Sequence, residues 1–268
     1  MRYHTIEEVR VAKTFNELLK IRKYNDRHDE LGRFAPKGSG TASGFKPAGT
    51  IAEAREYAKT QLGFSGVVDY GYSYIDQKTV QQVGGTLDID TVNHINGTIT
   101  DIQSKYPELK GYVTNMVCEN TNTYATLLHS GRDGSATLII GAKAYKDGHK
   151  AVEEKWAEDV DLGYHPKGTN ASSILWHEYG HAYAAMENAK TGNKMRAIQN
   201  STSETKWKDA AAKKLGTDSS TYGNNVSRYS TVNDGELFAE AFAAYNSSNV
   251  SNEWANAIVE AAGADRRK

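Results

Sequence analysis

Three residues in the stretch SSILWHEYGHAYAAM, residues 172–186, have the types and the spacing needed to activate a water molecule. His177 and His181 are four residues apart, so a helix places both rings on one face, where they can bind one metal ion. Neutral imidazole is a good zinc ligand, and a catalytic zinc typically has three protein ligands and one water. Glu178 can reach that water as a general base without binding the metal. The pattern H-E-x-x-H therefore predicts a site for Zn²⁺-dependent hydrolysis.

The third zinc ligand must come from elsewhere in the chain. The metzincin pattern needs a glycine and a histidine three and six residues after the second histidine, where this chain has Ala184 and Glu187. Without the glycine the helix should continue and carry Glu187 away from the metal, so we exclude Glu187 as a ligand. A glycine-threonine-x-x-aspartate motif is also missing, because LGTDSS, residues 215–220, has the wrong spacing.

A second predicted helix offers two carboxylates, in the stretch SRYSTVNDGELFAEAFAAYN, residues 227–246. Asn233 or Asp234 can cap this helix, and its phenylalanines predict that one face is buried. Glu236 and Glu240 are four residues apart and share a face. One carboxylate on the zinc, with the other bonded to a ligand histidine, would fix the orientation of the imidazole ring.

Together, HEYGHAY and YSTVNDGELFAEAFAAYNSS resemble the catalytic domain of anthrax lethal factor and related zincin-type metallopeptidases. The resemblance fades upstream of residue 170. The residues that carry it are His177, Glu178, Gly180, His181, Tyr229, Glu236, Phe238, Ala239, Glu240, Ala241 and Phe242.

This resemblance implies a role for each matching polar residue. His177, His181 and Glu236 would bind zinc, which makes Glu236 a gluzincin-type third ligand, and Glu178 would be the general base. Tyr229, seven residues before Glu236, would donate its hydroxyl to the developing oxyanion. The carboxylate of Glu240 would hydrogen-bond a ligand histidine.

Two features bear on where a substrate lies. Gly180 in mid-helix costs about 1 kcal/mol relative to alanine, which predicts that a strand or a substrate approaches closely there. In zincin folds an edge strand before the motif helix binds the substrate as an added strand, and ATLIIGAKAY, residues 136–145, is the expected strand, with a plain core strand as the alternative. His129, His149 and His165 are expected at the surface or in hydrogen bonds, without a role as ligands.

The elements that must position these residues follow from periodicity and turn signals. Strands come first and helices after, which predicts an α+β fold with a small mixed sheet. The expected helices are 50–63, 86–107, a short one within 147–171, 172–190, 203–215, 233–246 and 251–262, and the expected strands are 110–118, 123–130 and 136–145, with a hairpin turn at 129–136.

The composition of the first fifty residues indicates a boundary. Residues 5–24 have apolar positions at helical spacing, so 1–30 is expected to be a helical segment, and 31–50 contains two of the four prolines and five glycines, which is typical of a flexible linker. The catalytic domain would then span 51–268. NDRHDELGRFAPKGSG, residues 25–40, resembles connector segments of phage and prophage structural proteins.

The whole-chain composition excludes several classes of protein. A formal net charge of −1 over 268 residues lacks the positive charge of a nucleic-acid binder. The single cysteine, Cys118, is expected to be a buried, inert thiol, and it cannot form an internal disulfide. Neither a signal peptide nor an apolar run of membrane-spanning length is expected, so the chain would be cytoplasmic at synthesis and virion-associated or exported by a route the sequence does not show.

Two hypotheses about function follow from these patterns. The first is a zinc-dependent metalloendopeptidase acting on a polypeptide substrate, as a phage- or prophage-encoded toxin or processing protease. The alternative is a phage-associated structural or interaction module with a non-catalytic zinc site, whose residues 1–30 contact a phage structural protein. A structural zinc site usually has four protein ligands and has no need of Glu178 or Tyr229, which favours the first hypothesis.

Overall fold

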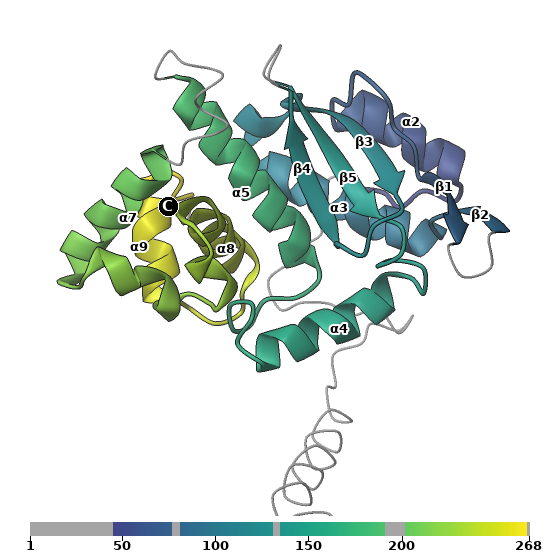
Figure 1. Ribbon diagram of the computed structural model, residues 1–268. Coiled ribbons are helices and arrows are strands. Elements are labelled where there is room, and N and C mark those ends of the chain that lie inside the picture. Colours follow the sequence, from purple (N-terminus) through teal and green to yellow (C-terminus); the bar gives the residue numbers. More distant parts are fainter. Residues whose placement is uncertain (1–44, 77–80, 131–134, 191–201, 267–268) are drawn as a thin grey trace, which may run out of the picture. The chain divides into compact units, whose positions relative to one another are not determined.

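The computed structural model describes residues 45–76, 81–130, 135–190 and 202–266, all within one compact unit that spans Thr41–Lys268. This unit combines helices with small sheets, which confirms the expected α+β class (Figure 1). Its described elements are α2 (Ile51–Gln61), β1 (Gly71–Asp76), β2 (Gln81–Thr86), α3 (Ile89–Lys105), η1 (Pro107–Leu109), β3 (Val113–Glu119), β4 (Ala125–His129), β5 (Ala136–Gly141), α4 (His149–Asp161), α5 (Ser172–Ala189), α7 (Thr202–Leu215), η2 (Ser219–Asn225), η3 (Tyr229–Thr231), α8 (Asp234–Ser247) and α9 (Glu253–Ala261).

The main sheet has three strands in the order β3-β5-β4. β3 runs parallel to β5, and β4 pairs antiparallel with β5 from Ala125↔Ile140 to His129↔Ala136. The expected hairpin between β4 and β5 is therefore present, although residues 131–134 at its turn lie outside the described residues. As Figure 1 shows, this sheet lies on one side of α5, and α7, α8 and α9 lie on the other.

The prediction that residues 136–145 form the substrate-binding edge strand is wrong. β5 ends at Gly141, and both of its edges are hydrogen-bonded, one to β3 and the other to β4. A strand in the middle of a sheet has no free peptide groups to offer a ligand. The free edge nearest to the motif helix belongs to β4.

The helices predicted within the described residues all occur, and their ends follow from local chemistry. Thr50 and Glu53 form a capping box at the start of α2, and Gly63, with φ of 76°, follows its end. Asp88 caps α3 through the Thr91 N–H. Residues 45–50, which belong to the predicted linker, pack against α3, where Ala48 exchanges two hydrogen bonds with Asn93. The predicted helical segment at 1–30 and linker residues 31–44 lie outside the described residues.

The motif helix α5 and the carboxylate helix α8 pack directly against each other, with Gly180 at the contact. A Cβ atom at Gly180 would lie 3.0 Å from the Ala239 Cα and 3.2 Å from the Phe242 Cβ. The glycine therefore makes room for a neighbouring helix, and the expectation that a strand or substrate approaches there is wrong. α5 is buried on nearly every side, which is typical of a helix at the centre of a domain.

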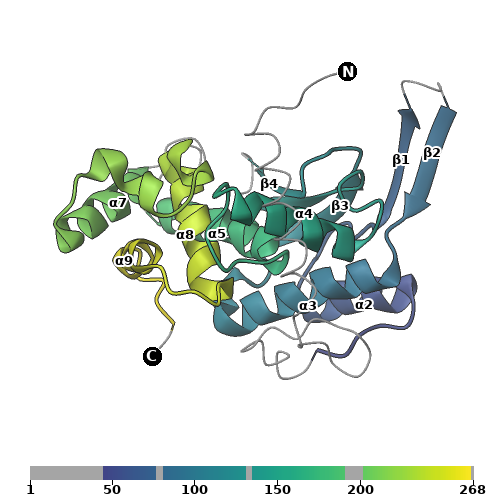
Figure 2. The same cartoon turned by 90° about the horizontal axis from the view of Figure 1, so that it is seen from below.

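One feature of the fold was not predicted from the sequence. β1 and β2 form a separate antiparallel hairpin, and Figure 2 shows it extending away from the helices of the same unit.

In the main sheet, Cys118 lies half-buried in β3, and burial raises the pKa of its thiol to about 12, as expected of an inert thiol. No helix among the described residues has the length and apolar character needed to cross a membrane.

The contact at Gly180 generates a stability prediction. Gly180→Ala should lower the free energy of unfolding by about 1–3 kcal/mol, because the added methyl group meets helix backbone and overpacks the contact. Gly97→Ala in α3 is a matched control, since the nearest atoms to its methyl group would be those of the Phe45 ring, at 3.2 Å, and a side chain can move where helix backbone cannot. There the better helix propensity of alanine should maintain or raise stability. Urea unfolding of both variants checks this, and equal stabilities would contradict the account of α5–α8 packing.

Candidate metal centre

α5 presents both motif histidines to one point. The Nε2 atoms of His177 and His181 lie 3.1 Å apart, and their rings are nearly perpendicular, at 81°. The helix is held at its start by Glu153 of α4, whose carboxylate accepts a hydrogen bond from the Ala171 N–H, and by Asn170, whose side chain accepts one from the Ser172 N–H. The i, i+4 spacing on a buried helix therefore brings the two nitrogens together.

α8 adds Glu236 to the same point. Asn233 caps this helix by accepting a hydrogen bond from the Glu236 N–H, which fixes the first turn. The Glu236 Oε2 lies 3.1 Å from the His177 Nε2 and 3.4 Å from the His181 Nε2. His177, His181 and Glu236 thus form a group of three side chains whose ligand atoms converge. Glu187, which we excluded, instead pairs with Lys190 near the end of α5.

The geometry of this group fits a bound cation. The Glu236 Oε2 is buried and has no hydrogen-bond partner among the described residues, although two histidine nitrogens are close to it. A buried carboxylate oxygen without a donor is costly unless a cation compensates it. Ligand atoms of a tetrahedral zinc at about 2.0–2.1 Å lie about 3.3 Å from one another. The three observed separations match that spacing, so the residues present fit a zinc ion.

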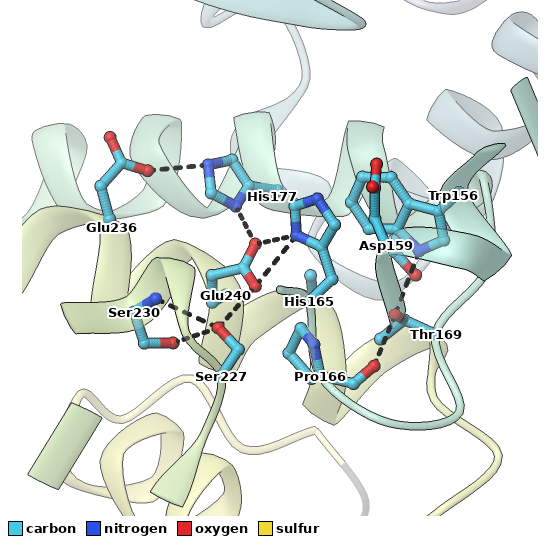
Figure 3. A network of polar contacts seen from close by, with 12 residues as sticks. Trp156, Asp159, His165, Pro166, Thr169, His177, Ser227, Ser230, Glu236 and Glu240 are labelled. Carbon is cyan, nitrogen blue, oxygen red and sulfur yellow. Dashed lines mark hydrogen bonds and ion pairs between the residues drawn. The ribbon is translucent and has the colours of Figure 1, made fainter. Parts of the chain in front are cut away.

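Glu240 fixes the other ring nitrogen of His177. Its carboxylate is fully buried and contacts the His177 Nδ1 at 3.0 Å, the His165 Nδ1 at 3.2 Å and the Ser227 Oγ at 2.9 Å (Figure 3). A hydrogen on Nδ1 of His177 leaves the lone pair on Nε2, which is the atom that faces Glu236. This hydrogen bond therefore selects the tautomer that can bind a metal.

The two carboxylates dominate the electrostatics of His177. Burial by itself would lower the pKa of the imidazole, but Glu236 and Glu240 outweigh burial and raise that pKa to about 10. Burial would likewise raise the pKa of Glu236, yet the two histidines hold it well below its usual range. The group thus favours a positive charge at its centre, which a proton or a metal cation can supply.

Glu178 contacts the sheet and lines the same cavity as the three converging side chains. Its Oε2 accepts a hydrogen bond of 2.7 Å from the Leu127 N–H of β4. The residue is buried next to His177 but is not one of the three ligand candidates. Its carboxylate is thus held between the motif helix and the free edge of the sheet.

Tyr229 lies in η3, beside the histidines. Its ring centroid is 5.9 Å from that of His177, and it also contacts His165 and Tyr164. Burial, helped by the charge of Glu236, raises the pKa of its hydroxyl to about 12. The hydroxyl therefore stays protonated at neutral pH and can donate a hydrogen bond.

A cavity of about 560 Å³ opens at this group. β4, α5, η3 and the starts of α7 and α8 line it, and Tyr124, Trp156 and Tyr164 form an aromatic part of its wall. Its described lining residues include four carboxylates and neither lysine nor arginine. The acidic residues are Asp159, Glu178, Glu204 and Glu236.

The structure adds residues that the sequence analysis did not select. His165 is hydrogen-bonded, as expected, but it belongs to the site, because it bonds Glu240 and stacks on Trp156 with ring centroids 3.7 Å apart. Ser227 carried no signal beyond its place before the α8 stretch. Leu127 contributes a main-chain N–H, which no side-chain pattern encodes. His149 is elsewhere, stacked on His94 between α3 and α4.

No family model, curated protein or solved structure matches this chain. The candidate site is therefore characterised by its own geometry and donor chemistry.

The geometry predicts a graded loss of zinc affinity. Glu240→Ala should weaken zinc binding by about 10- to 100-fold, the usual effect of removing a group that orients a ligand. Glu236→Ala should weaken it more, because a ligand itself is lost. Glu187→Ala, the control on α5, should leave affinity unchanged, since Glu187 pairs with Lys190. Competition titration with a chromophoric chelator measures all three, and a Glu236→Ala protein with unaltered affinity would exclude this residue as a ligand.

Proposed function

We propose that this protein is a zinc-dependent metalloendopeptidase with a zincin-like catalytic domain, in which His177, His181 and Glu236 hold the metal. The observation that carries the proposal is the convergence of the three ligand atoms within 3.1–3.4 Å, next to a carboxylate that stays outside the group. Two imidazoles and one glutamate are a donor set typical of catalytic zinc, which keeps one position for water. The resemblance of the two motif stretches to the lethal factor catalytic domain supports the same proposal.

In this proposal Glu178 moves the protons. When bound, a zinc ion supplies a Lewis acid that lowers the pKa of a water molecule and polarises a carbonyl group. Glu178 takes a proton from the attacking water and later delivers it to the nitrogen of the leaving amine. The Leu127 N–H binds Oε2 and leaves Oε1 for that proton.

Tyr229 and β4 complete the proposed reaction site. The Tyr229 hydroxyl is the donor for the oxyanion that develops on the scissile carbonyl. The free edge of β4 runs beside α5 along the cavity and suits a polypeptide that adds as a further strand. The substrate is accordingly an extended polypeptide segment. Cleavage by a phage- or prophage-encoded toxin or processing protease is the biological setting that residues 25–40 suggest.

The proposal predicts that Glu178→Gln abolishes cleavage and retains zinc. Mass-spectrometric mapping of cuts in a diverse peptide library should show activity lower by at least about 100-fold, because the general base is lost while the ligands remain. Glu187→Gln is the control on the same helix. A Glu178→Gln protein as active as the wild type would contradict the mechanism. No cuts by zinc-loaded wild-type protein would favour the structural or interaction role.

A further inference from the structure

A second histidine–tyrosine pair lies beside the candidate metal centre. His129 is the last residue of β4 and lines the cavity together with His181. Its Nδ1 is 3.2 Å from the hydroxyl of Tyr112, which directly precedes β3. β5 lies between β3 and β4, and its residue Ala136 pairs with His129. The small side chain of Ala136 leaves room for the contact between His129 and Tyr112 across β5.

The contact with Tyr112 determines which ring nitrogen of His129 carries the hydrogen. Among the described residues, the Tyr112 hydroxyl has no other hydrogen-bond acceptor. The Tyr112 hydroxyl therefore donates its hydrogen to Nδ1 of His129. Since Nδ1 then accepts, the ring hydrogen of a neutral His129 is on Nε2. Burial, together with the nearby His181, lowers the pKa of His129 to about 4, so the ring is neutral at pH 7. Nε2–H is then a donor of a residue that lines the cavity.

The free edge of β4 lacks one donor that an added strand would use. Tyr124 and Ser130 bond toward β5, so the peptide groups of Ala125, Leu127 and His129 face away from it. The middle donor of this row, the Leu127 N–H, is already bound to Glu178. A polypeptide along β4 therefore meets a carboxylate-bound N–H where an ordinary ladder would supply a donor. His129 is the next residue after Leu127 whose peptide group faces away from β5, and its side chain carries a donor of its own.

We propose that His129 is a substrate-binding residue whose Nε2–H donates a hydrogen bond to a carbonyl oxygen of the polypeptide bound along β4, with Tyr112 positioning its ring. This inference rests on the proposed peptidase function. The Nε2–H of His129 would replace the Leu127 N–H as a donor to the substrate, because the Leu127 N–H is already bonded to Glu178. Neither His129 nor Tyr112 belongs to the group that binds the metal.

Kinetics on peptides cut by the wild type test the donor. His129→Leu should raise KM by about 3- to 10-fold, the usual effect of one neutral hydrogen bond, with kcat and zinc content little changed. His129→Gln keeps an N–H at the position of Nε2 and should restore most of the loss. Tyr112→Phe should give a smaller increase in KM, because the ring remains but loses its fixed tautomer. A His129→Leu protein with wild-type KM would overturn the proposal.

A second measurement needs no substrate. Two-bond ¹H–¹⁵N correlation spectra of the zinc-loaded wild type, with His129→Leu to assign the signals, should show hydrogen on Nε2 of His129. Hydrogen on Nδ1 would overturn the proposal even in a protein that cleaves peptides. The failures are distinguishable: a wild type that cuts no peptide overturns the peptidase function and this inference with it. Cleavage that does not depend on His129 overturns this inference alone.

Discussion

The close approach of α5 and α8 at Gly180 is the contact on which the candidate site depends. Because Gly180 has no side chain, the backbone of Ala239 comes close enough for the two helices to share their polar residues. Glu236 and Glu240, one turn apart on α8, then bracket the ring of His177, one at each nitrogen. A shift of α8 by one residue, about 1.5 Å along its axis, would break both contacts.

Buried charge is the second constraint, and it connects the site to the rest of the fold. The fully buried Glu240 is tolerable because three donors surround it, from α5, from the loop before α5 and from the loop before η3. Among the described residues, the buried Oε2 of Glu236 has no hydrogen-bond donor, and it lies next to His177, whose ring Glu240 holds. A cation that joins Glu236 to both histidines would therefore contribute to folding stability as well as to chemistry.

Local patterns predicted the helices and the His177–His181 pair, because helical periodicity and capping act over a few residues. The sequence spacing alone did not show which of Glu236 and Glu240 would bind the metal, and only the resemblance distinguished their roles. The packing of the helices places Glu236 at Nε2 of His177 and Glu240 at Nδ1. The prediction that β5 is an edge strand was wrong, because strand order depends on long-range pairing that a single strand does not encode. Its nearly continuous apolar run is nevertheless typical of a central strand. Main-chain contacts such as the Leu127 N–H to Glu178 leave no trace in residue types.

Anomalous diffraction at the zinc edge, from crystals of the zinc-loaded protein, tests the central claim most directly. The account predicts one ion bonded to the Nε2 atoms of His177 and His181 and to a Glu236 oxygen, at about 2.0–2.1 Å, with a position left open to water. An ion bound without Glu236 would contradict the account. So would an ion closed off by a fourth protein ligand, which is the arrangement of a structural zinc site.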